Sequence, residues 1–192
     1  MLLHERNGIE IELKFLLKEE TPEGFAKKFK NILGGTKRVY QKTVMFDNEQ
    51  GLMQVTNGRI RLRQTDGRVT LSYKRPIPNG NIKKEIEWEV DVGDWRSMEN
   101  ILTALGFKET TSYEKYRSTY QYNNVKIEMD EYPFANFVEI EGKEDKIKET
   151  AQMLGFDLRD NLVDSCDTLF TKWRLQKQLP IKLHMRFDDY DK

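Results

Sequence analysis

The sequence lacks several features that would assign it to a common class of protein. Cys166 is its only cysteine, so a disulfide within the chain is excluded and a cytoplasmic location is expected. There is no apolar run of about 18 residues, and His4, Glu5 and Arg6 near the N-terminus are not typical of a signal peptide, so no membrane partner is expected. The other histidine, His184, lies near the opposite end, and we expect both histidines to be surface residues.

A net charge of one sign is also absent. Lys and Arg number 32, and Asp and Glu also number 32. With no net field to attract a polyanion, nucleic acid is not an expected partner, although local basic sites are compatible with this balance. With 192 residues, 38% of them hydrophobic, the chain is long enough for one domain with a substantial core. We predict a single domain over 1–179 and a loosely attached C-terminal extension over 180–192, where no periodicity is clear.

Alternation of apolar and polar residues is the main pattern that the sequence does contain. Asp66-Gly67 separates two alternating segments as a hairpin turn, and Asn123-Asn124 separates two more. The alternation predicts strands near 8–17, 38–47, 58–65, 68–76, 82–92, 113–121, 124–130 and 136–142.

Helical patterns lie between and after these strands. Thr21-Pro22 begins one of them as a cap followed by proline, and Asp94 can cap another. The segments 101–107 and 151–156 resemble each other, and each lies in a helix that follows an acidic strand, as expected for two similar halves around one sheet. The predicted helices cover 22–33, 95–105, 143–154 and 161–178.

The first predicted strand carries charge on one face only. Glu10, Glu12 and Lys14 alternate with apolar residues, so the three charged side chains share a face. The two carboxylates then lie roughly 6.6 Å apart, from a rise of about 3.3 Å per residue. This spacing suits a shared hard cation, with an ammonium group one step further along the strand.

The other strands repeat this division into an apolar face and a charged face. A water-exposed face is the ordinary explanation for any single strand. Two details favour an interior instead: the faces are nearly pure charge, and basic and acidic residues are segregated. The basic residues are Arg61, Arg63, Lys74, Lys115 and Arg117, and the acidic ones are Glu10, Glu12, Glu85, Glu87, Asp130, Glu139 and Glu141.

The expected fold is therefore α+β, a closed antiparallel β-barrel that forms a tunnel, with helices packed outside. Closing the sheet with its charged face inward leaves no exposed edge and lets the helices cover the apolar outside. A lumen with cations and carboxylates suits a polyphosphate bound with a divalent metal. Guanidinium and ammonium groups bind phosphate oxygens, and carboxylates bind Mg²⁺ or Mn²⁺.

These residues also resemble the CYTH family of triphosphate tunnel metalloenzymes, which includes class IV adenylyl cyclases, thiamine triphosphatases and inorganic triphosphatases. The resemblance covers about residues 9–156, in the order of the family's motifs. The matching segments are Glu10-x-Glu12-x-Lys14, Ile60-Arg61-Leu62-Arg63, Leu71-Ser72-Tyr73-Lys74, the acidic strand 84–90, Lys115-x-Arg117, and the endings 127–133 and 137–142.

The resemblance implies roles for individual residues. Metal binding falls to Glu10 and Glu12 with Glu139 and Glu141, and Asp130 lies near them. Glu85 and Glu87 match acidic residues that hold a second metal or position the nucleophile, and they are the catalytic candidates together with Lys14. The implied triphosphate ligands are Lys14, Arg61, Arg63, Lys74, Lys115 and Arg117.

Three functions are compatible with these residues. The first is a metal-dependent triphosphatase that hydrolyses the terminal phosphoanhydride of an inorganic or organic triphosphate, with Mg or Mn. It is preferred because both sets of charges recognise triphosphate, whereas no residue is identified that specifies adenine. The second is a class IV adenylyl cyclase, which makes cyclic AMP and pyrophosphate from ATP. The third is a binding module without turnover, which would need fewer carboxylates. A homodimer is compatible with each of them.

Overall fold

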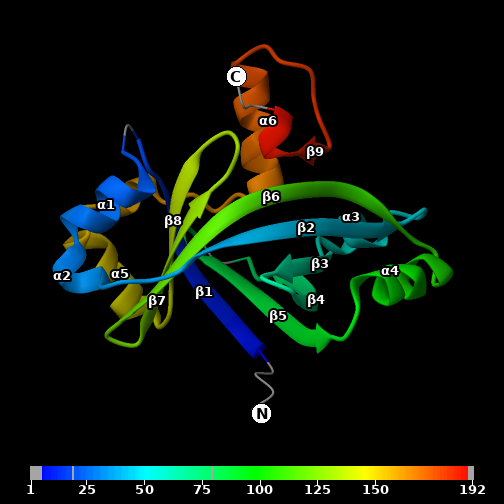
Figure 1. Cartoon of the computed structure of the whole chain (residues 1–192), viewed down its shortest axis with the longest axis horizontal. Helices are drawn as coiled ribbons and strands as arrows, with labels where there is room; N and C mark the ends of the chain where they lie inside the picture. Colours follow the sequence, from blue (N-terminus) through cyan, green and yellow to red (C-terminus); the bar gives the residue numbers. More distant parts are fainter. Residues whose placement is uncertain (1–5, 19, 79, 190–192) are drawn as a thin grey trace.

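A computed structural model describes residues 6–18, 20–78 and 80–189, so the prediction for His4 and the end of the extension lie outside the described residues. In the described part, eight strands hydrogen-bond in the order β2-β3-β4-β5-β1-β8-β7-β6, and pairing of β2 with β6 closes the barrel (Figure 1). All pairings among the eight are antiparallel, which confirms the predicted fold. The strands are β1 (Arg6–Leu16), β2 (Arg38–Asn48), β3 (Arg59–Thr65), β4 (Arg68–Pro76), β5 (Lys83–Val92), β6 (Phe107–Tyr122), β7 (Val125–Glu131) and β8 (Asn136–Glu141).

The strand register sends the charged faces inward and the apolar faces outward. Lys14 of β1 lies opposite Glu139 of β8, and Glu10 lies opposite Glu85 of β5. Between these charged positions, Leu13 is 2% exposed although it faces away from the lumen. The outward apolar residues are therefore covered by other elements rather than by water.

Helices outside the barrel supply this cover (Figure 1). They are α1 (Pro22–Lys28), α2 (Lys30–Leu33), α3 (Leu52–Thr56), α4 (Trp95–Ala104), α5 (Glu144–Met153) and α6 (Cys166–Gln176). Each of the three longest contributes to a separate apolar cluster: Ile147 of α5 with Leu13, Leu102 of α4 with Leu62, and Phe170 of α6 with Phe137. No helix among the described residues combines the length and apolar composition required to cross a membrane.

Two helix predictions differ from the structure. The first predicted helix is divided at Phe29, which separates α1 from α2. The fourth begins at Cys166 rather than near 161 because the preceding residues bind β1: the Asn161 side-chain oxygen accepts from the Lys14 backbone N–H at 2.8 Å, and the Leu162 N–H donates to the Lys14 carbonyl at 2.8 Å. These hydrogen bonds hold residues 161 and 162 along the edge of β1, ahead of the helix.

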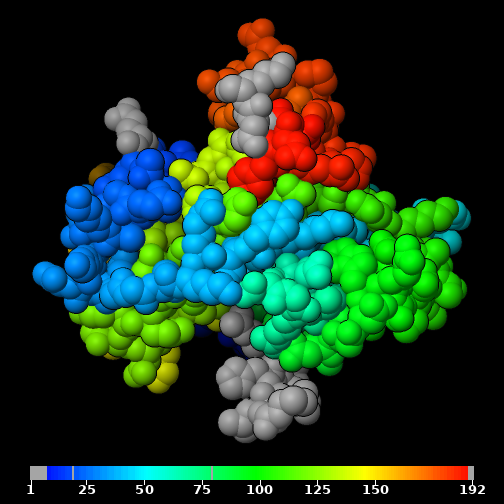
Figure 2. Space-filling model, in the orientation of Figure 1, coloured from blue at the N-terminus to red at the C-terminus, as the bar shows by residue number. Residues whose placement is uncertain are grey.

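Part of the C-terminal extension, predicted as a loosely attached segment, contacts the barrel. His184 and Met185 form β9 (His184–Met185), which pairs in parallel with Ser112 and Tyr113 of β6. Figure 2 shows the red C-terminal segment lying against the green of β6. Met185 is 2% exposed and belongs to the apolar cluster of α6. A single buried side chain has no periodicity, so the sequence pattern does not reveal it.

This attachment gives a prediction for stability. Met185→Ala is expected to lower the free energy of unfolding by about 2 kcal/mol, because it leaves a cavity between the tail and α6. Leu183→Ala is the matched control, since Leu183 is 59% exposed and its loss should cost less than about 0.5 kcal/mol. Urea denaturation monitored by tryptophan fluorescence measures both, and equal stability of the two variants would contradict the attachment.

Candidate active site inside the barrel

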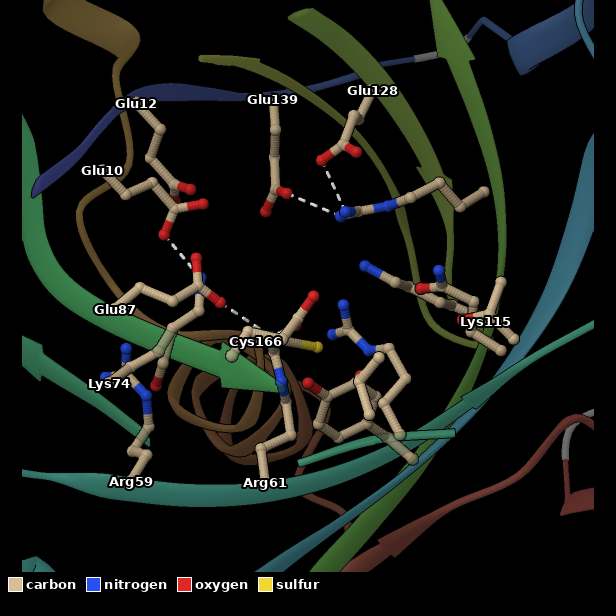
Figure 3. Close-up of a pocket in the computed structure, with 18 of the residues that line it drawn as sticks. Glu10, Glu12, Arg59, Arg61, Lys74, Glu87, Lys115, Glu128, Glu139 and Cys166 are labelled. Carbon is tan, nitrogen blue, oxygen red and sulfur yellow. Dashed lines mark hydrogen bonds and ion pairs between the residues drawn. The ribbon is translucent and has the colours of Figure 1, made fainter. Parts of the chain in front are cut away.

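A cavity of about 330 Å³ occupies the barrel interior (Figure 3). All eight barrel strands contribute to its lining, together with residues 165–167 where α6 begins. Most of the residues proposed from the sequence line it: Glu10, Glu12, Lys14, Arg61, Arg63, Lys74, Glu85, Glu87, Lys115, Arg117 and Glu139. Asp130 and Glu141 are not part of the lining.

Lysines on two strands, β4 and β1, connect the acidic side chains of β1, β5 and β8. The Lys74 Nζ lies 2.5 Å from a Glu10 oxygen and 3.1 Å from a Glu87 oxygen. The Lys14 Nζ lies 3.1 Å from a Glu139 oxygen and 3.7 Å from a Glu12 oxygen. Burial alone would lower the pKa of Lys14, but Glu139 and Glu12 outweigh it and raise that pKa above its ordinary value. Lys14 is therefore charged throughout the neutral range.

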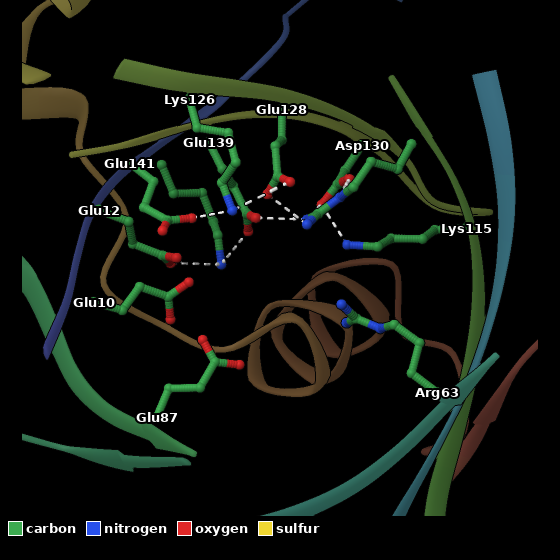
Figure 4. Close-up of polar contacts among 12 residues, drawn as sticks. Glu10, Glu12, Arg63, Glu87, Lys115, Lys126, Glu128, Asp130, Glu139 and Glu141 are labelled. Carbon is green, nitrogen blue, oxygen red and sulfur yellow. Dashed lines mark hydrogen bonds and ion pairs between the residues drawn. The ribbon is translucent and has the colours of Figure 1, made fainter. Parts of the chain in front are cut away.

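Arg117 is the centre of the most highly connected group of charges (Figure 4). Its guanidinium donates to Glu128 at 2.5 Å, to Asp130 at 2.5 Å and to Glu139 at 2.7 Å. Burial would raise the pKa of Glu128, but Arg117 and then Lys126 outweigh burial and lower it to about 2. Asp130 is fully buried, and both of its oxygens are bound by Arg117 and Lys115, so it lies behind the cavity wall.

Three cations, Arg63, Lys115 and Arg117, lie on one side of the cavity. Burial and the nearby Arg117 lower the pKa of Lys115 to about 7, although Asp130 lies 2.6 Å from its Nζ. Among the described residues, Arg63 forms no ion pair, and its Nε donates only to the Thr43 hydroxyl at 3.3 Å. Figure 4 shows Arg63 apart from the paired groups. We name Arg63, Lys115 and Arg117 the cationic side of the cavity.

Comparison with known proteins places this geometry in a family. A family model of the CYTH domain matches residues 8–156. The chain belongs to the CYTH family. A Methanocaldococcus jannaschii protein named as a candidate adenylate cyclase is 28% identical over 148 residues, 76% of this chain and 82% of that protein.

Solved structures share the CYTH fold of this chain. A conserved hypothetical protein from Pyrococcus furiosus gives a TM-score of 0.69 at 25% identity, over 82% of this chain and 97% of that chain. A candidate adenylyl cyclase from Hippeastrum, described as having a dominant triphosphatase activity, gives a TM-score of 0.58 at 16% identity, over 91% and 98% of the two chains. CYTH enzymes are triphosphatases or adenylyl cyclases, and they depend on a metal ion.

The carboxylates of this CYTH chain suit a hard divalent metal. Glu10 and Glu12 of β1 lie beside Glu139 and Glu141 of β8, and Glu12 is directly opposite Glu141. Their carboxylate oxygens are the ligands that such metals prefer. In the part of the chain that the structure describes, no three acidic, histidine or cysteine side chains gather as a ligand group, because these carboxylates turn toward lysines and arginines.

Several lining residues of the CYTH barrel are absent from the site proposed from the sequence. Arg59, Lys83, Glu89, Lys126 and Glu128 share the inward parity of their strands, so the same alternation could have identified them. By contrast, Gln41, Tyr132 and Cys166 carry no local signal. Cys166 lines the cavity only because the start of α6 meets the barrel, a contact that depends on the tertiary fold.

Proposed function

We propose that this CYTH protein hydrolyses the terminal phosphoanhydride of a triphosphate inside the barrel, using Mg²⁺ or Mn²⁺. The observation that carries the proposal is the cationic side of the cavity, where Arg63 forms no ion pair among the described residues. Burial, together with the nearby Arg117, lowers the pKa of Lys115 to about 7. A bound polyanion would pair with Arg63 and stabilise the charged form of Lys115, which favours a ligand with several negative charges over a neutral one.

The cavity can hold a triphosphate by exchanging its internal ion pairs. The cations on its walls that we propose as phosphate ligands are Lys14, Arg61, Arg63, Lys74, Lys115 and Arg117. Arg63 is already without a carboxylate partner among the described residues, and as each of the other cations turns from a carboxylate to a phosphate oxygen, one favourable pairing replaces another. The exchange therefore proceeds without leaving a charge buried and unpaired.

The carboxylates released by this exchange are the proposed metal ligands. Glu10, Glu12, Glu139 and Glu141 supply only oxygen atoms, as Mg²⁺ and Mn²⁺ require. The metal would polarise phosphoryl oxygens and offset the charge that develops on them. We retain Asp130 as a nearby acidic group, which in this structure holds Arg117 and Lys115 in place.

Glu85 and Glu87 are proposed to orient the attacking water. Burial would raise the pKa of Glu85, but Lys83 and Arg59 outweigh it and lower that pKa, so the carboxylate is ionised at neutral pH. An ionised carboxylate accepts a hydrogen bond from water and directs its lone pair away from itself. Glu87 is held between Lys74 and Arg61, with Nζ and guanidinium nitrogen each 3.1 Å from it.

Cyclisation of ATP to cyclic AMP and pyrophosphate is the second candidate. The name of the 28% identical relative from M. jannaschii favours it. The Hippeastrum protein, which resembles this chain in fold, bears a cyclase name and a dominant triphosphatase activity, so the shared fold does not separate the two reactions.

Product analysis separates these candidates. Purified protein is incubated with Mg²⁺ or Mn²⁺ and with ATP, inorganic triphosphate or thiamine triphosphate, and phosphate, pyrophosphate and cyclic AMP are measured. Hydrolysis predicts phosphate without cyclic AMP from at least one substrate. Cyclic AMP and pyrophosphate without phosphate would identify a cyclase instead, and the absence of every product would favour a binding module.

A further inference from the structure

Glu85 of β5 lines the cavity and is almost fully buried, at 1% exposed, but few groups hold it. Among the described residues its only hydrogen bond comes from the Arg59 guanidinium, which donates to Oε1. The Glu85 Oε2 accepts no hydrogen bond from the described part of the chain, although the Lys83 Nζ lies 3.1 Å away as an ion pair. Buried polar atoms are nearly always hydrogen-bonded in native proteins. This oxygen is therefore an acceptor for a donor that the described chain does not supply.

Lys83 is shared between Glu85 and a second carboxylate. Its Nζ donates to a Glu12 oxygen at 2.7 Å, whereas its contact with the Glu85 Oε2 is an ion pair without a hydrogen bond. The Glu85 Oε2 is buried in this structure. Because Lys83 can turn away from Glu85 and keep its hydrogen bond to Glu12, this oxygen can open to the cavity without the loss of a hydrogen bond.

The arginine that binds Glu85 has no other described partner. A second arginine of β3, Arg61, binds the neighbouring candidate on β5 by donating to Glu87 at 3.1 Å, but it also donates to Glu89 at 3.3 Å. Arg59 pairs with Glu85 alone among the described residues. Arg61 therefore divides its donors between carboxylates, whereas Arg59 serves one of them.

The strand register explains why Glu85 needs this partner. Glu85 lies directly opposite Glu10 of β1, and like charges in directly opposite positions repel each other. Arg59 lies on the other side of β5, on β3 beyond β4, so it draws the Glu85 carboxylate away from Glu10. Figure 3 shows Arg59 across the cavity from Lys115. Arg59 is therefore placed to hold Glu85 and lies apart from the cationic side.

We propose that Arg59 is a positioning residue for the hydrolysis: it anchors one oxygen of Glu85, so that the other is presented to the attacking water. The inference rests on the proposed function, and it assigns Arg59 to Glu85 rather than to the triphosphate. An anchored carboxylate accepts the O–H of water in one direction, whereas a mobile one orients the water poorly. The loss of Arg59 should therefore act on kcat and not on the affinity for the substrate.

The first test separates kcat from KM. In Arg59→Met we expect kcat for a cleaved triphosphate to fall about ten- to one-hundredfold, with KM within about threefold of wild type. Arg59→Lys keeps a charged donor and should restore kcat to within about fivefold of wild type. Arg38→Met is the matched control. Arg38 of β2 lies outside the cavity lining and donates to Glu131 of β7 at 2.7 Å across the intervening β6, and its loss should leave both constants within about twofold.

A double-mutant cycle tests whether Arg59 acts through Glu85. Glu85→Ala should itself lower kcat, and the addition of Arg59→Met should lower kcat by less than about twofold more, because the carboxylate to be positioned is gone. A further loss of tenfold or more in the Glu85→Ala background overturns the inference. Arg59→Gln takes the place of Arg59→Met in the same cycle if Arg59→Met does not fold.

Calorimetric titration of inorganic triphosphate without metal gives a measurement that does not depend on turnover. Arg59→Met should bind this ligand within about threefold of wild type. A loss of affinity of more than tenfold, or a similar rise in KM with kcat unchanged, would identify Arg59 as a phosphate ligand and overturn the inference. If wild-type protein hydrolyses no triphosphate, the proposed function fails and the role of Arg59 fails with it. Wild-type hydrolysis together with an unchanged kcat in Arg59→Met overturns the inference alone.

Discussion

Replacing Glu10 and Glu12 together by glutamine is expected to reduce metal-dependent turnover of a triphosphate by about a thousandfold or more. Glutamine keeps the size and shape of glutamate but removes the charge that would hold a divalent metal. A metal contributes several kcal/mol of charge stabilisation to the transition state, and each 1.36 kcal/mol changes the rate about tenfold. Steady-state kinetics over a series of Mg²⁺ and Mn²⁺ concentrations measures the loss.

Phosphate binding should survive in the same double variant. Lys74 now pairs with Glu10, and Lys14 and Lys83 pair with Glu12, so the substitutions remove one of the two carboxylate partners of each lysine and make it more available to phosphate oxygens. Calorimetry without metal is expected to give a triphosphate affinity equal to or above that of wild type. Loss of turnover together with retained binding separates a metal role from a general electrostatic one.

The matched control replaces two glutamates outside the barrel interior. Glu49 and Glu149 each pair with a surface lysine, as Glu10 pairs with a buried one. Glu49→Gln/Glu149→Gln removes the same total charge and should leave turnover at the wild-type level. Full activity of Glu10→Gln/Glu12→Gln would contradict the proposed mechanism.

The largest loss of stability is expected for Arg117→Met, at about 3–5 kcal/mol near pH 7. The substitution removes the partner of Glu128, Asp130 and Glu139, which are all largely buried. Losing this guanidinium is costly because each buried carboxylate then keeps a lysine partner but loses the cation that binds all three. Equilibrium denaturation by urea measures the difference from wild type.

The pH dependence of that loss identifies its cause. The pKa of Glu128 is lowered to about 2 from an ordinary 4.5. A lowered carboxyl pKa contributes stability that is fully present above pH 4.5 and is lost as the pH falls toward 2. Without Arg117 the carboxylates take up protons at higher pH, so the deficit of the variant should shrink below about pH 5. A deficit independent of pH would indicate lost packing instead, and Arg159→Met, at an exposed arginine, should leave the denaturation midpoint unchanged.

The fold could be predicted because each strand shows its own alternation of apolar and charged residues. The alternation in β1 and β5 predicts that each segment is a strand and which of its faces is charged. The Asp66-Gly67 turn predicts the pairing of β3 with β4. Because alternate residues of a strand share a face, the sequence also predicts which charged side chains point inward, without knowledge of which strands are neighbours. The predicted strand limits lie within a few residues of the observed ones, except that β6 begins at Phe107 rather than near 113.

Features that depend on contacts between distant segments could not be predicted. The start of α6 depends on Asn161 and Leu162 pairing with Lys14, about 147 residues away in the chain. The pairing of Lys74 with both Glu10 and Glu87 requires the closed barrel. The unsatisfied oxygen of Glu85 is recognisable only when its surroundings are known. The sequence thus predicts which groups enter the lumen, whereas the fold determines which of them meet.

The inward parity of the charges has a further consequence for accurate folding. A slip of one residue in a strand pairing would point carboxylates and ammonium groups beneath the helices, and apolar side chains into the lumen. A slip of β1 against β8 would separate Lys14 from Glu139 and leave both charges buried and unpaired, which costs far more than a lost apolar contact. The groups proposed to process the substrate therefore also favour the correct strand register, because mispaired states have a higher free energy even without a ligand.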